Sequence, residues 1–192
     1  MMQDLSSFKM PEDFRGRSVF IVQLWWIVEA TLFRHSLRRA DGFRRWLLRL
    51  FGARVGKKVI IRSTVRITYP WKITIGDHSW IGDDVELYSL GEIIIGSNTV
   101  ISQHSYLCGG DHDYRLPDFP IRSRTIRVED EAWVACHVYI APGVTIGHGA
   151  VIGARSAVFE DMPAKMVCVG SPCRPIKPRL PEPVLKFVEN AA

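Results

Sequence analysis

Aliphatic residues recur every six positions through the middle of this chain, and this period constrains the fold more than any other feature. Each group of three begins an 18-residue block, and the blocks cover residues 55–72, 75–92, 95–112, 128–145 and 146–163. Hexapeptide repeats are typical of parallel β-helices, in which three short strands form one triangular coil. The repeat therefore predicts an all-β fold of about five coils, with one aliphatic side chain of each hexad inside the prism. These positions are Val55, Ile61, Ile67, Ile75, Ile81, Leu87, Ile95, Ile101, Leu107, Val128, Val134, Ile140, Ile146, Ile152 and Val158.

Glycine follows the aliphatic residue in I-G-D-H, I-G-D-D, I-G-S-N, I-G-H-G and I-G-A-R. Glycine adopts backbone angles that other residues reach only with strain, so we expect these glycines at tight corners. An ordinary β-sandwich with glycine turns is the alternative, but it predicts alternation with a period of two and irregular strand spacing. The regular hexads favour the β-helix.

The grid is interrupted in three places. Two-residue insertions at 73–74 and 93–94 separate the first three blocks, and residues 113–127 separate the third block from the fourth. This longer segment reads D-Y-R-L-P-D-F-P-I-R-S-R-T-I-R, and its two prolines and alternating charges predict a protruding loop. Long loops on a rigid repeat scaffold commonly carry function, so we expect the functional site beside this loop.

Two basic segments flank the predicted β-helix of residues 55–163. Residues 1–54 carry ten Lys and Arg against five Asp and Glu, and the extended arm of residues 164–192 carries five against two. The repeat region carries ten against thirteen. The chain has no nucleic-acid recognition motif and no basic stripe with interleaved aromatic residues, so nucleic acid is not an expected partner.

The N-terminal segment reads as two helices. Its apolar run predicts a helix over Val19–Phe33 with Ser18 as N-cap, and a second helix is expected over Phe43–Phe51, ending at Gly52. The simplest interpretation is a cap that covers the strand edges of the first coil. Peripheral contact with anionic lipid is the alternative, because arginines decorate both helices. They are Arg34, Arg38, Arg39, Arg44, Arg45 and Arg49.

Composition suits one compact unit with appendages, since 47% of the 192 residues are hydrophobic and 23% are charged. The four cysteines form no C-x-x-C pair, which favours a reducing cytosol over a disulfide framework. The first dozen residues are polar, so no cleavable signal peptide is expected. We therefore expect a cytoplasmic protein. Peripheral contact with the inner face of the cytoplasmic membrane is the alternative location.

Several stretches resemble a known family. They are Y-L-C-G-G-D-H-D-Y before the loop, W-V-A-C-H-V-Y-I-A-P-G-V-T-I-G after it and V-G-S-P-C-R-P-I-K near the end. Together with the hexads they are similar to the hexapeptide-repeat O-acetyltransferases. V-Q-L-W-W-I-V-E-A-T-L-F and R-I-T-Y-P-W-K resemble the colanic-acid biosynthesis branch of that family. The resemblance implies a left-handed β-helix, a homotrimer, acetyl-CoA as donor and a sugar hydroxyl as acceptor.

One histidine stands where the third block meets the loop. A sugar hydroxyl needs a base to take its proton as it attacks a thioester, and histidine is the side chain best matched to that role near neutral pH. His112 also matches the family's catalytic histidine, although Asp111 precedes it where the branch commonly has Ser. We expect Asp111 or Asp113 to stabilise the imidazolium.

The resemblance also implies sites for both substrates. Asp83, Asp84 and Tyr88 match the acceptor-binding region, where carboxylates would accept charge-assisted hydrogen bonds from sugar hydroxyls. In the donor site, the backbone at Cys136 and Ala154 would pair with pantetheine. The basic residues near the CoA phosphates would be Arg174 and Lys177. Glu160 departs from the family pattern, because relatives often carry Lys there.

Three alternatives remain to be weighed. A γ-class carbonic anhydrase shares the fold but needs an H-x4-H pair, which this chain lacks, so no metal is expected. A noncatalytic β-helix scaffold would retain neither His112 nor the loop and basic arm. An acetyltransferase for a free small sugar or for serine is the serious rival. The tryptophan-rich N-terminal helix favours a polysaccharide precursor, so the expected acceptor is a sugar or a lipid-linked oligosaccharide.

Overall fold

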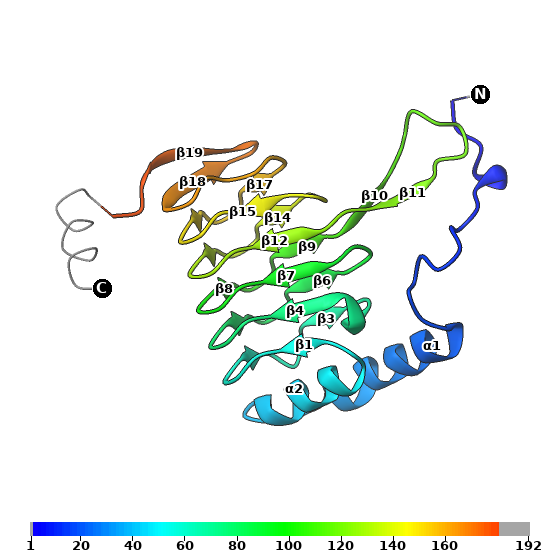
Figure 1. The fold of residues 1–192 in the computed structure, drawn as a ribbon, viewed down its shortest axis with the longest axis horizontal. Helices are drawn as coiled ribbons and strands as arrows, with labels where there is room; N and C mark the ends of the chain where they lie inside the picture. The colour runs from blue at the N-terminus through cyan, green and yellow to red at the C-terminus, as the bar shows by residue number, and fades with distance from the viewer. Residues whose placement is uncertain (1, 181–192) are drawn as a thin grey trace.

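The computed structural model describes residues 2–180 of the chain and shows a three-sided solenoid of parallel sheets (Figure 1). Sheet A contains β1 (Arg54–Val55), β4 (Ile73–Ile75), β7 (Ile93–Ile95), β12 (Ile126–Val128) and β15 (Thr145–Ile146). Sheet B contains β2 (Ile60–Ile61), β5 (Trp80–Ile81), β8 (Val100–Ile101), β13 (Trp133–Val134), β16 (Val151–Ile152), β18 (Met166–Gly170) and β19 (Cys173–Pro178). Sheet C contains β3 (Arg66–Ile67), β6 (Glu86–Tyr88), β9 (Tyr106–Cys108), β14 (Tyr139–Ile140) and β17 (Ala157–Val158).

The solenoid is a left-handed parallel β-helix, as predicted. Five coils contribute a strand to all three sheets. A partial sixth coil follows, because β18 pairs in parallel with β16 and Met162 bridges to Ile146. β19 then turns back and pairs antiparallel with β18. The first part of the basic arm therefore lies on the end of the β-helix, while residues 181–192 of the arm lie outside the described residues.

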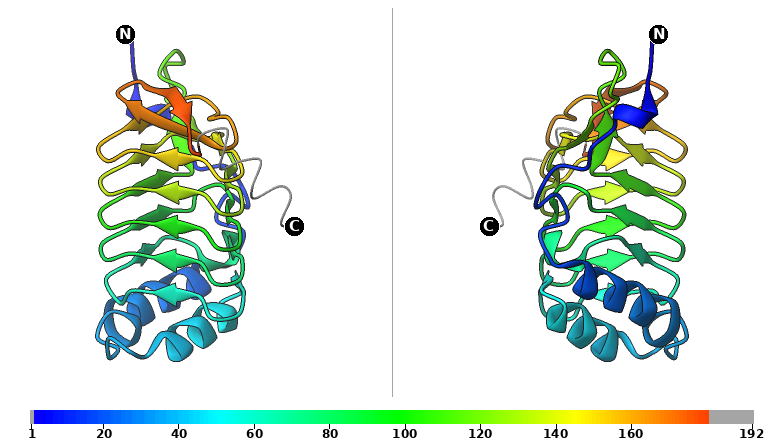
Figure 2. Two further views of the ribbon diagram at one scale, coloured as in Figure 1. Left: turned by 90° about the vertical axis from the view of Figure 1, so that its left-hand side faces the viewer. Right: turned by 90° about the vertical axis from the view of Figure 1, so that its right-hand side faces the viewer.

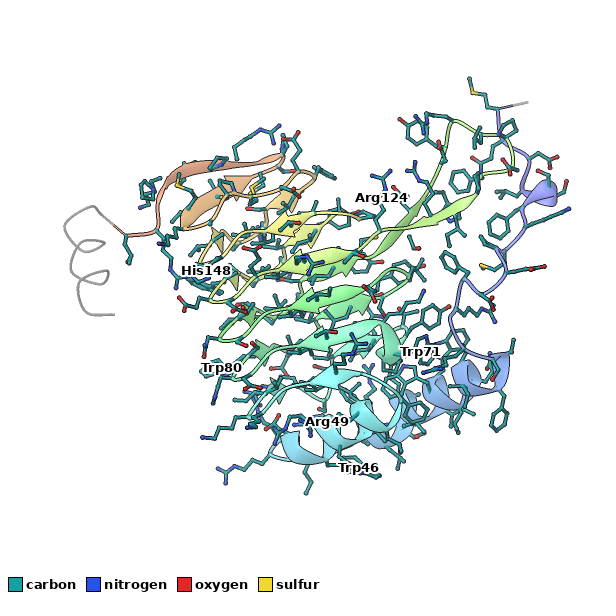
Figure 3. All side chains as sticks on the ribbon, in the orientation of Figure 1. Trp46, Arg49, Trp71, Trp80, Arg124 and His148 are labelled. Atoms are coloured by element: carbon teal, nitrogen blue, oxygen red, sulfur yellow. The ribbon has the colours of Figure 1, made fainter. Side chains whose placement is uncertain are left out.

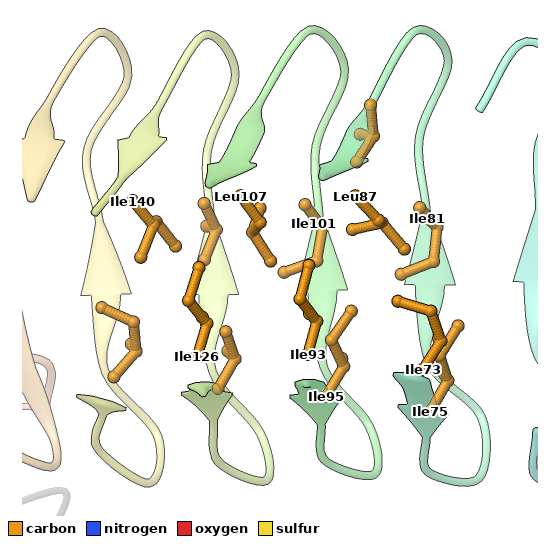
Figure 4. Close-up of a cluster of buried hydrophobic side chains, with 14 of the residues drawn as sticks. Ile73, Ile75, Ile81, Leu87, Ile93, Ile95, Ile101, Leu107, Ile126 and Ile140 are labelled. Carbon is orange, nitrogen blue, oxygen red and sulfur yellow. The ribbon is translucent and has the colours of Figure 1, made fainter. Parts of the chain in front are cut away.

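The interior of the prism is the predicted hydrophobic grid. All fifteen grid residues are buried, and Val55, at 8% exposure, is the least enclosed of them. Equivalent residues stack from coil to coil, as Ile81 and Ile101 do in sheet B (Figure 4). Because consecutive strand residues point to opposite faces, the residue before each grid position points outward. The grid thus determines what each face of the prism presents.

The glycines and the left-handed corner residues occupy different positions. Positive φ angles fall on residues such as His78 (61°) and Asp84 (54°), not on the glycine after the aliphatic residue. At Gly76 a Cβ atom would lie 2.5 Å from the backbone nitrogen of Ser97 in the next coil. These glycines are therefore required by close approach between coils. The expectation that they supply special backbone angles was wrong.

Two N-terminal helical segments lie across the first coil (Figure 2). The predicted first helix comprises α1 (Val19–Val28), N-capped by the Ser18 hydroxyl, and a following π-helical turn, η2 (Glu29–Phe33). The second, α2 (Asp41–Leu50), begins two residues earlier than predicted. No helix within residues 2–180 combines the length and the apolar character needed to cross a membrane. Short 3-10 turns, η1 (Leu5–Ser7) and η3 (Pro70–Lys72), complete the helical structure of the described residues.

Side chains of the helices satisfy the open strand edge of the first coil. The Trp25 indole donates to the Ile67 carbonyl at 2.7 Å, and the buried Arg44 guanidinium donates to the Ile61 carbonyl at 2.5 Å. The Glu29 carboxylate accepts from the Ile67 amide at 2.6 Å. An unpaired buried backbone group is costly, so these contacts fix the helices on the prism end.

The N-terminal segment before α1 runs along the side of the prism (Figure 1). The Trp71 indole and the Lys72 ammonium hold it near the first coils, by donating to the Arg15 and Phe14 carbonyls, each at 2.7 Å. At its other end the Asp4 amide donates to the Pro117 carbonyl at 2.7 Å. The segment therefore joins the helical end of the molecule to the loop of residues 113–127.

Candidate active site

The interruption after the third coil is a hairpin that projects from the prism. β10 (Gly110–His112) pairs antiparallel with β11 (Ile121–Ser123), and His112 stands opposite Ile121. Figure 1 shows this hairpin leaning away from the coils toward the N-terminal segment. The predicted protruding loop is thus present, and its first strand carries the candidate base.

The His112 imidazole is oriented by Phe119 at the end of the hairpin. Its Nδ1 lies 2.8 Å from the Phe119 carbonyl oxygen, and the two rings stack with centroids 4.3 Å apart and an interplanar angle of 11°. A carbonyl oxygen only accepts hydrogen bonds, so in the neutral imidazole the proton resides on Nδ1. The lone pair then resides on Nε2, as a general base requires.

A second aromatic residue approaches His112 from the far N-terminus. The Phe8 ring lies 6.0 Å from the imidazole, centroid to centroid, at an interplanar angle of 54°. Sequence reasoning identified neither Phe8 nor Phe119. Both lie in irregular segments with no repeat register to relate them to His112, so the sequence held no signal for either contact.

The two aspartates beside His112 bind arginines. Arg122 donates to both carboxylate oxygens of Asp111, each at 2.8 Å. Arg115 donates to Asp113 at 2.8 and 2.6 Å, and Arg122 approaches it at 3.3 Å. Hydrogen bonding to Arg115 holds the pKa of Asp113 well below its usual range. Both carboxylates therefore form ion pairs with arginines of the hairpin. Their stabilisation of the imidazolium stays a prediction.

Tyrosines line the outer face of sheet C below the hairpin. Tyr88, Tyr106 and Tyr139 stack at centroid spacings of 5.9 and 6.0 Å, and the Cys108 thiol beneath them contacts the Gly110 carbonyl. Burial, reinforced by Cys108, raises the pKa of Tyr139 to about 12. Burial likewise raises the pKa values of Tyr88 and Tyr106. These phenols remain protonated donors at neutral pH. Tyr88, an expected acceptor residue, thus lies on the hairpin side of the molecule.

The expected acceptor aspartates lie at the opposite end of sheet C. Asp83 and Asp84 precede β6, and Tyr88 ends it. Because Asp83 and Asp84 form the corner before this strand, where Asp84 has a φ of 54°, they lie at the opposite end of β6 from Tyr88. Asp84 lies 3.9 Å from the His104 Nδ1 atom, and Asp83 lies 3.8 Å from the Arg62 guanidinium. Within a single chain, these carboxylates therefore do not lie beside His112.

The two expected pantetheine positions lie on the same corner as the aspartates, in later coils. The Arg155 amide donates to the Cys136 carbonyl at 3.0 Å, which stacks Ala154 of the fifth coil against Cys136 of the fourth. His137, beside Cys136, stacks on His104 with ring centroids 4.8 Å apart. The four cysteines are free thiols. Cys136 and Ala154 are thus neighbours, and neither is close to His112 in the same chain.

The expected phosphate-binding residues lie on β19. Arg174 is 3.4 Å from the Glu160 carboxylate, and both side chains are more than half exposed. Glu160, which stands where relatives often carry Lys, therefore partly neutralises the charge of Arg174. Lys177 is exposed on the same strand, opposite Val167 of β18. Within residues 2–180 no three His, Cys, Asp or Glu side chains converge as a metal site would require.

The left-handed hexapeptide β-helix is the fold of the hexapeptide-repeat acetyltransferases, and in this chain it carries a histidine on the hairpin after the third coil. No family model matches the chain. The chain is 54% identical to the proposed colanic acid biosynthesis acetyltransferase WcaF of Escherichia coli K12, over 93% of this chain and 98% of that one. The chain therefore belongs to the colanic acid biosynthesis acetyltransferases, as the sequence motifs predicted.

Solved structures agree with this assignment. A maltose O-acetyltransferase from Clostridium difficile 630 superposes with a TM-score of 0.75 and 29% identity, covering 84% of this chain and 89% of that one. The hexapeptide-repeat acetyltransferase VCA0836 from Vibrio cholerae, solved with acetyl-CoA, superposes with a TM-score of 0.77 and 25% identity. That match covers 86% of this chain and 92% of the other. The prediction of an acetyl-CoA-dependent acetyltransferase is confirmed at the level of the family.

Proposed function

We propose that this protein transfers an acetyl group from acetyl-CoA to a sugar hydroxyl of a colanic-acid-like exopolysaccharide precursor, with His112 as general base. The name of the Escherichia coli relative supports the pathway, and the acetyl-CoA complex of the Vibrio cholerae structure supports the donor. The maltose enzyme supports a sugar hydroxyl as acceptor. A free small sugar or serine is the rival acceptor.

The observation that carries the proposal is the hydrogen bond from His112 Nδ1 to the Phe119 carbonyl. In the neutral imidazole this bond places the proton on Nδ1 and the lone pair on Nε2, and it fixes the orientation of the ring on the hairpin. In the reaction the acceptor oxygen attacks the thioester carbonyl while Nε2 takes the hydroxyl proton. The tetrahedral intermediate then collapses, the C–S bond breaks, and the imidazolium returns the proton to the CoA sulfur.

The donor is proposed to lie along the corner formed by Cys136 and Ala154. Small side chains there leave the backbone accessible to the pantetheine amides, as close approach requires. Arg174 and Lys177 on β19 would meet the CoA phosphates. Because Glu160 already pairs with Arg174, we assign most of the phosphate attraction to Lys177.

A homotrimer would bring the separated parts of the site together. Tyr88 and His112 lie at one end of sheet C, whereas Asp83, Asp84 and Cys136 lie at the other. In a closed trimer, the corner of one chain faces the hairpin of its neighbour, so the acceptor and donor residues share one groove between subunits. Closed cyclic assemblies are the common arrangement for such chains.

The test is His112→Asn, compared with His78→Asn at a distant exposed corner. An asparagine amide retains a donor for the Phe119 carbonyl but supplies no base. We expect acetyl transfer to fall by about a hundredfold to ten-thousandfold for His112→Asn, with unchanged CoA affinity by calorimetry. His78→Asn should behave as the wild type. Near-normal transfer by His112→Asn would remove this residue from the mechanism, and assays on lipid-linked glycans, maltose and serine identify the acceptor class.

A further inference from the structure

The end of the prism formed by α1 and α2 carries apolar side chains that nothing within residues 2–180 covers. Residues 2–180 expose twenty large apolar side chains, and half of them fall between Val19 and Leu50. Phe20 is 73% exposed, Ile27 61% and Trp46 55%. We call six of these residues the apolar base. They are Phe20, Leu24 and Ile27 of α1 and Phe43, Trp46 and Leu50 of α2.

The apolar base results from the way the two helices cap the coil. α1 turns Val22 and Trp25 onto the coil, and it contains no charged residue on any side. A helix that is apolar all round is normally buried on all sides. Phe20, Leu24 and Ile27 follow an i, i+4, i+7 spacing, which places them on one stripe roughly opposite Trp25. Figure 3 shows Trp46 of α2 likewise projecting from the end of the molecule, away from the coils.

Positive charge surrounds the apolar base. Residues 17–50 contain seven arginines and two acidic residues, a balance of +5 that equals the formal net charge of the whole chain. Both acids are turned inward, Glu29 to the Ile67 amide and Asp41 to Arg44. The side chains of Arg38 and Arg39 are exposed and make no hydrogen bond or ion pair with the described residues. The exposed charge of this end is therefore positive.

We propose that the apolar base docks on the interface of an anionic lipid bilayer. The apolar side chains would enter the boundary between headgroups and acyl chains, while the arginines keep their guanidinium groups among the lipid phosphates. The neighbouring basic charge excludes a second copy as the occupant, since two bases facing each other would bring like charges together. An anionic surface satisfies both the apolar and the basic requirements. The prism then stands on the membrane by its helical end.

Vesicle cosedimentation with the full-length protein tests this directly. We expect binding to vesicles that contain phosphatidylglycerol, weaker binding to pure phosphatidylcholine, and release by salt. Arg38→Gln and Arg39→Gln should each lower the partition coefficient about fivefold, as expected for about 1 kcal/mol per basic residue near an anionic surface. No binding of the wild type to anionic vesicles would overturn the proposal.

Two matched isoleucine variants distinguish vesicle binding through the apolar base from binding through exposed apolar surface elsewhere. Ile27→Ser removes a side chain that is 61% exposed in the apolar base, and Ile176→Ser removes one that is 57% exposed on β19 at the other end of the prism. Only Ile27→Ser should weaken vesicle binding, and equal losses would refute the assignment. A lower oligomer mass for Ile27→Ser by light scattering would instead show that another protein chain covers the base. The measurement requires no acetyl transfer, so it is independent of the proposed activity.

Discussion

At the scale of single residues, Gly76 is one of several glycines at which the backbone of one coil closely approaches that of the next. A Cβ atom there would lie 2.5 Å from the Ser97 amide nitrogen, which belongs to the adjacent coil and cannot move independently. We expect Gly76→Ala to lower the free energy of unfolding by about 1–3 kcal/mol, the usual cost of overpacking. Urea denaturation measures this change.

Gly42 provides the control for that substitution. It lies in α2, and its added Cβ would meet nothing nearer than an Arg45 side-chain atom at 3.7 Å. Alanine favours a helix by roughly 0.5–1 kcal/mol over glycine, so Gly42→Ala should be neutral or stabilising. Equal destabilisation by the two substitutions would show that contact between coils is not the cause.

Among single residues, the sequence identified the candidate general base, His112, but not the side chains that contact it. His112 was predictable because it stands at a defined place, where a six-residue register ends and a proline-containing loop begins. Its contact with Phe119 depends on the hairpin path, and its contact with Phe8 joins segments about a hundred positions apart. The two neighbouring aspartates were expected to stabilise His112 because they adjoin it in sequence. In the structure they form ion pairs with Arg122 and Arg115.

At the scale of elements, the N-terminal segment and the hairpin form one unit around the proposed general base, His112. The Asp4 amide donates to the Pro117 carbonyl, and Phe8 contacts the His112 ring. Phe8→Ala should lower kcat roughly tenfold while leaving the KM for acetyl-CoA unchanged, since small displacements of a catalytic group are costly. Steady-state kinetics with both substrates varied measures this split.

Leu5→Ala is the matched control, because Leu5 lies on the same segment and is 62% exposed. Phe8→Tyr keeps the ring and should restore most of the rate. If Leu5→Ala and Phe8→Ala lower kcat equally, the segment acts through general stability and Phe8 has no positioning role.

β19 and the turn after β17 form a second such unit, in which Glu160 faces Arg174 across 3.4 Å. If Arg174 also meets a CoA phosphate, Glu160 competes for its charge. Glu160→Gln should then lower the dissociation constant for CoA by up to about fivefold, since exposed ion pairs are worth at most about 1 kcal/mol. Calorimetry measures this constant, and the double variant Glu160→Gln, Arg174→Ala should lose the gain. An unchanged constant in Glu160→Gln would place Arg174 away from the phosphates.

At the scale of the whole molecule, the fold was predictable because one periodic rule governs it. Every hexad position that the repeat placed inside the prism is buried, so the coil axis and the three faces follow from the sequence. The site does not obey that rule. Asp83, Cys136 and His112 occupy register positions in different coils, and the single chain leaves them at opposite ends of sheet C. Whether such residues cooperate depends on assembly, which no repeat register encodes.

The outer surface of sheet B indicates which face that assembly would cover. Its outward residues form an apolar ladder, in which each residue pairs with the next along the prism. The ladder comprises Ile60, Trp80, Val100, Trp133, Val151 and Val167. The corresponding rows of sheets A and C include Arg54, Arg127, Arg66 and Glu86. Sheet B is therefore the face that a second copy most readily buries.

Light scattering tests the trimer and this face together. The wild type should have three times the chain mass of 21.8 kDa, which is about 65 kDa for a closed trimer. Trp80→Arg places a charge within the apolar ladder, where Trp80 is 54% exposed in the single chain. The variant should dissociate and lose acetyl transfer, because each proposed groove needs residues from two chains. Trp46→Arg, at the apolar base and 55% exposed, should remain trimeric and active on a water-soluble acceptor. A monomeric Trp80→Arg protein with full activity would refute the shared site, since one chain would then contain everything that catalysis requires.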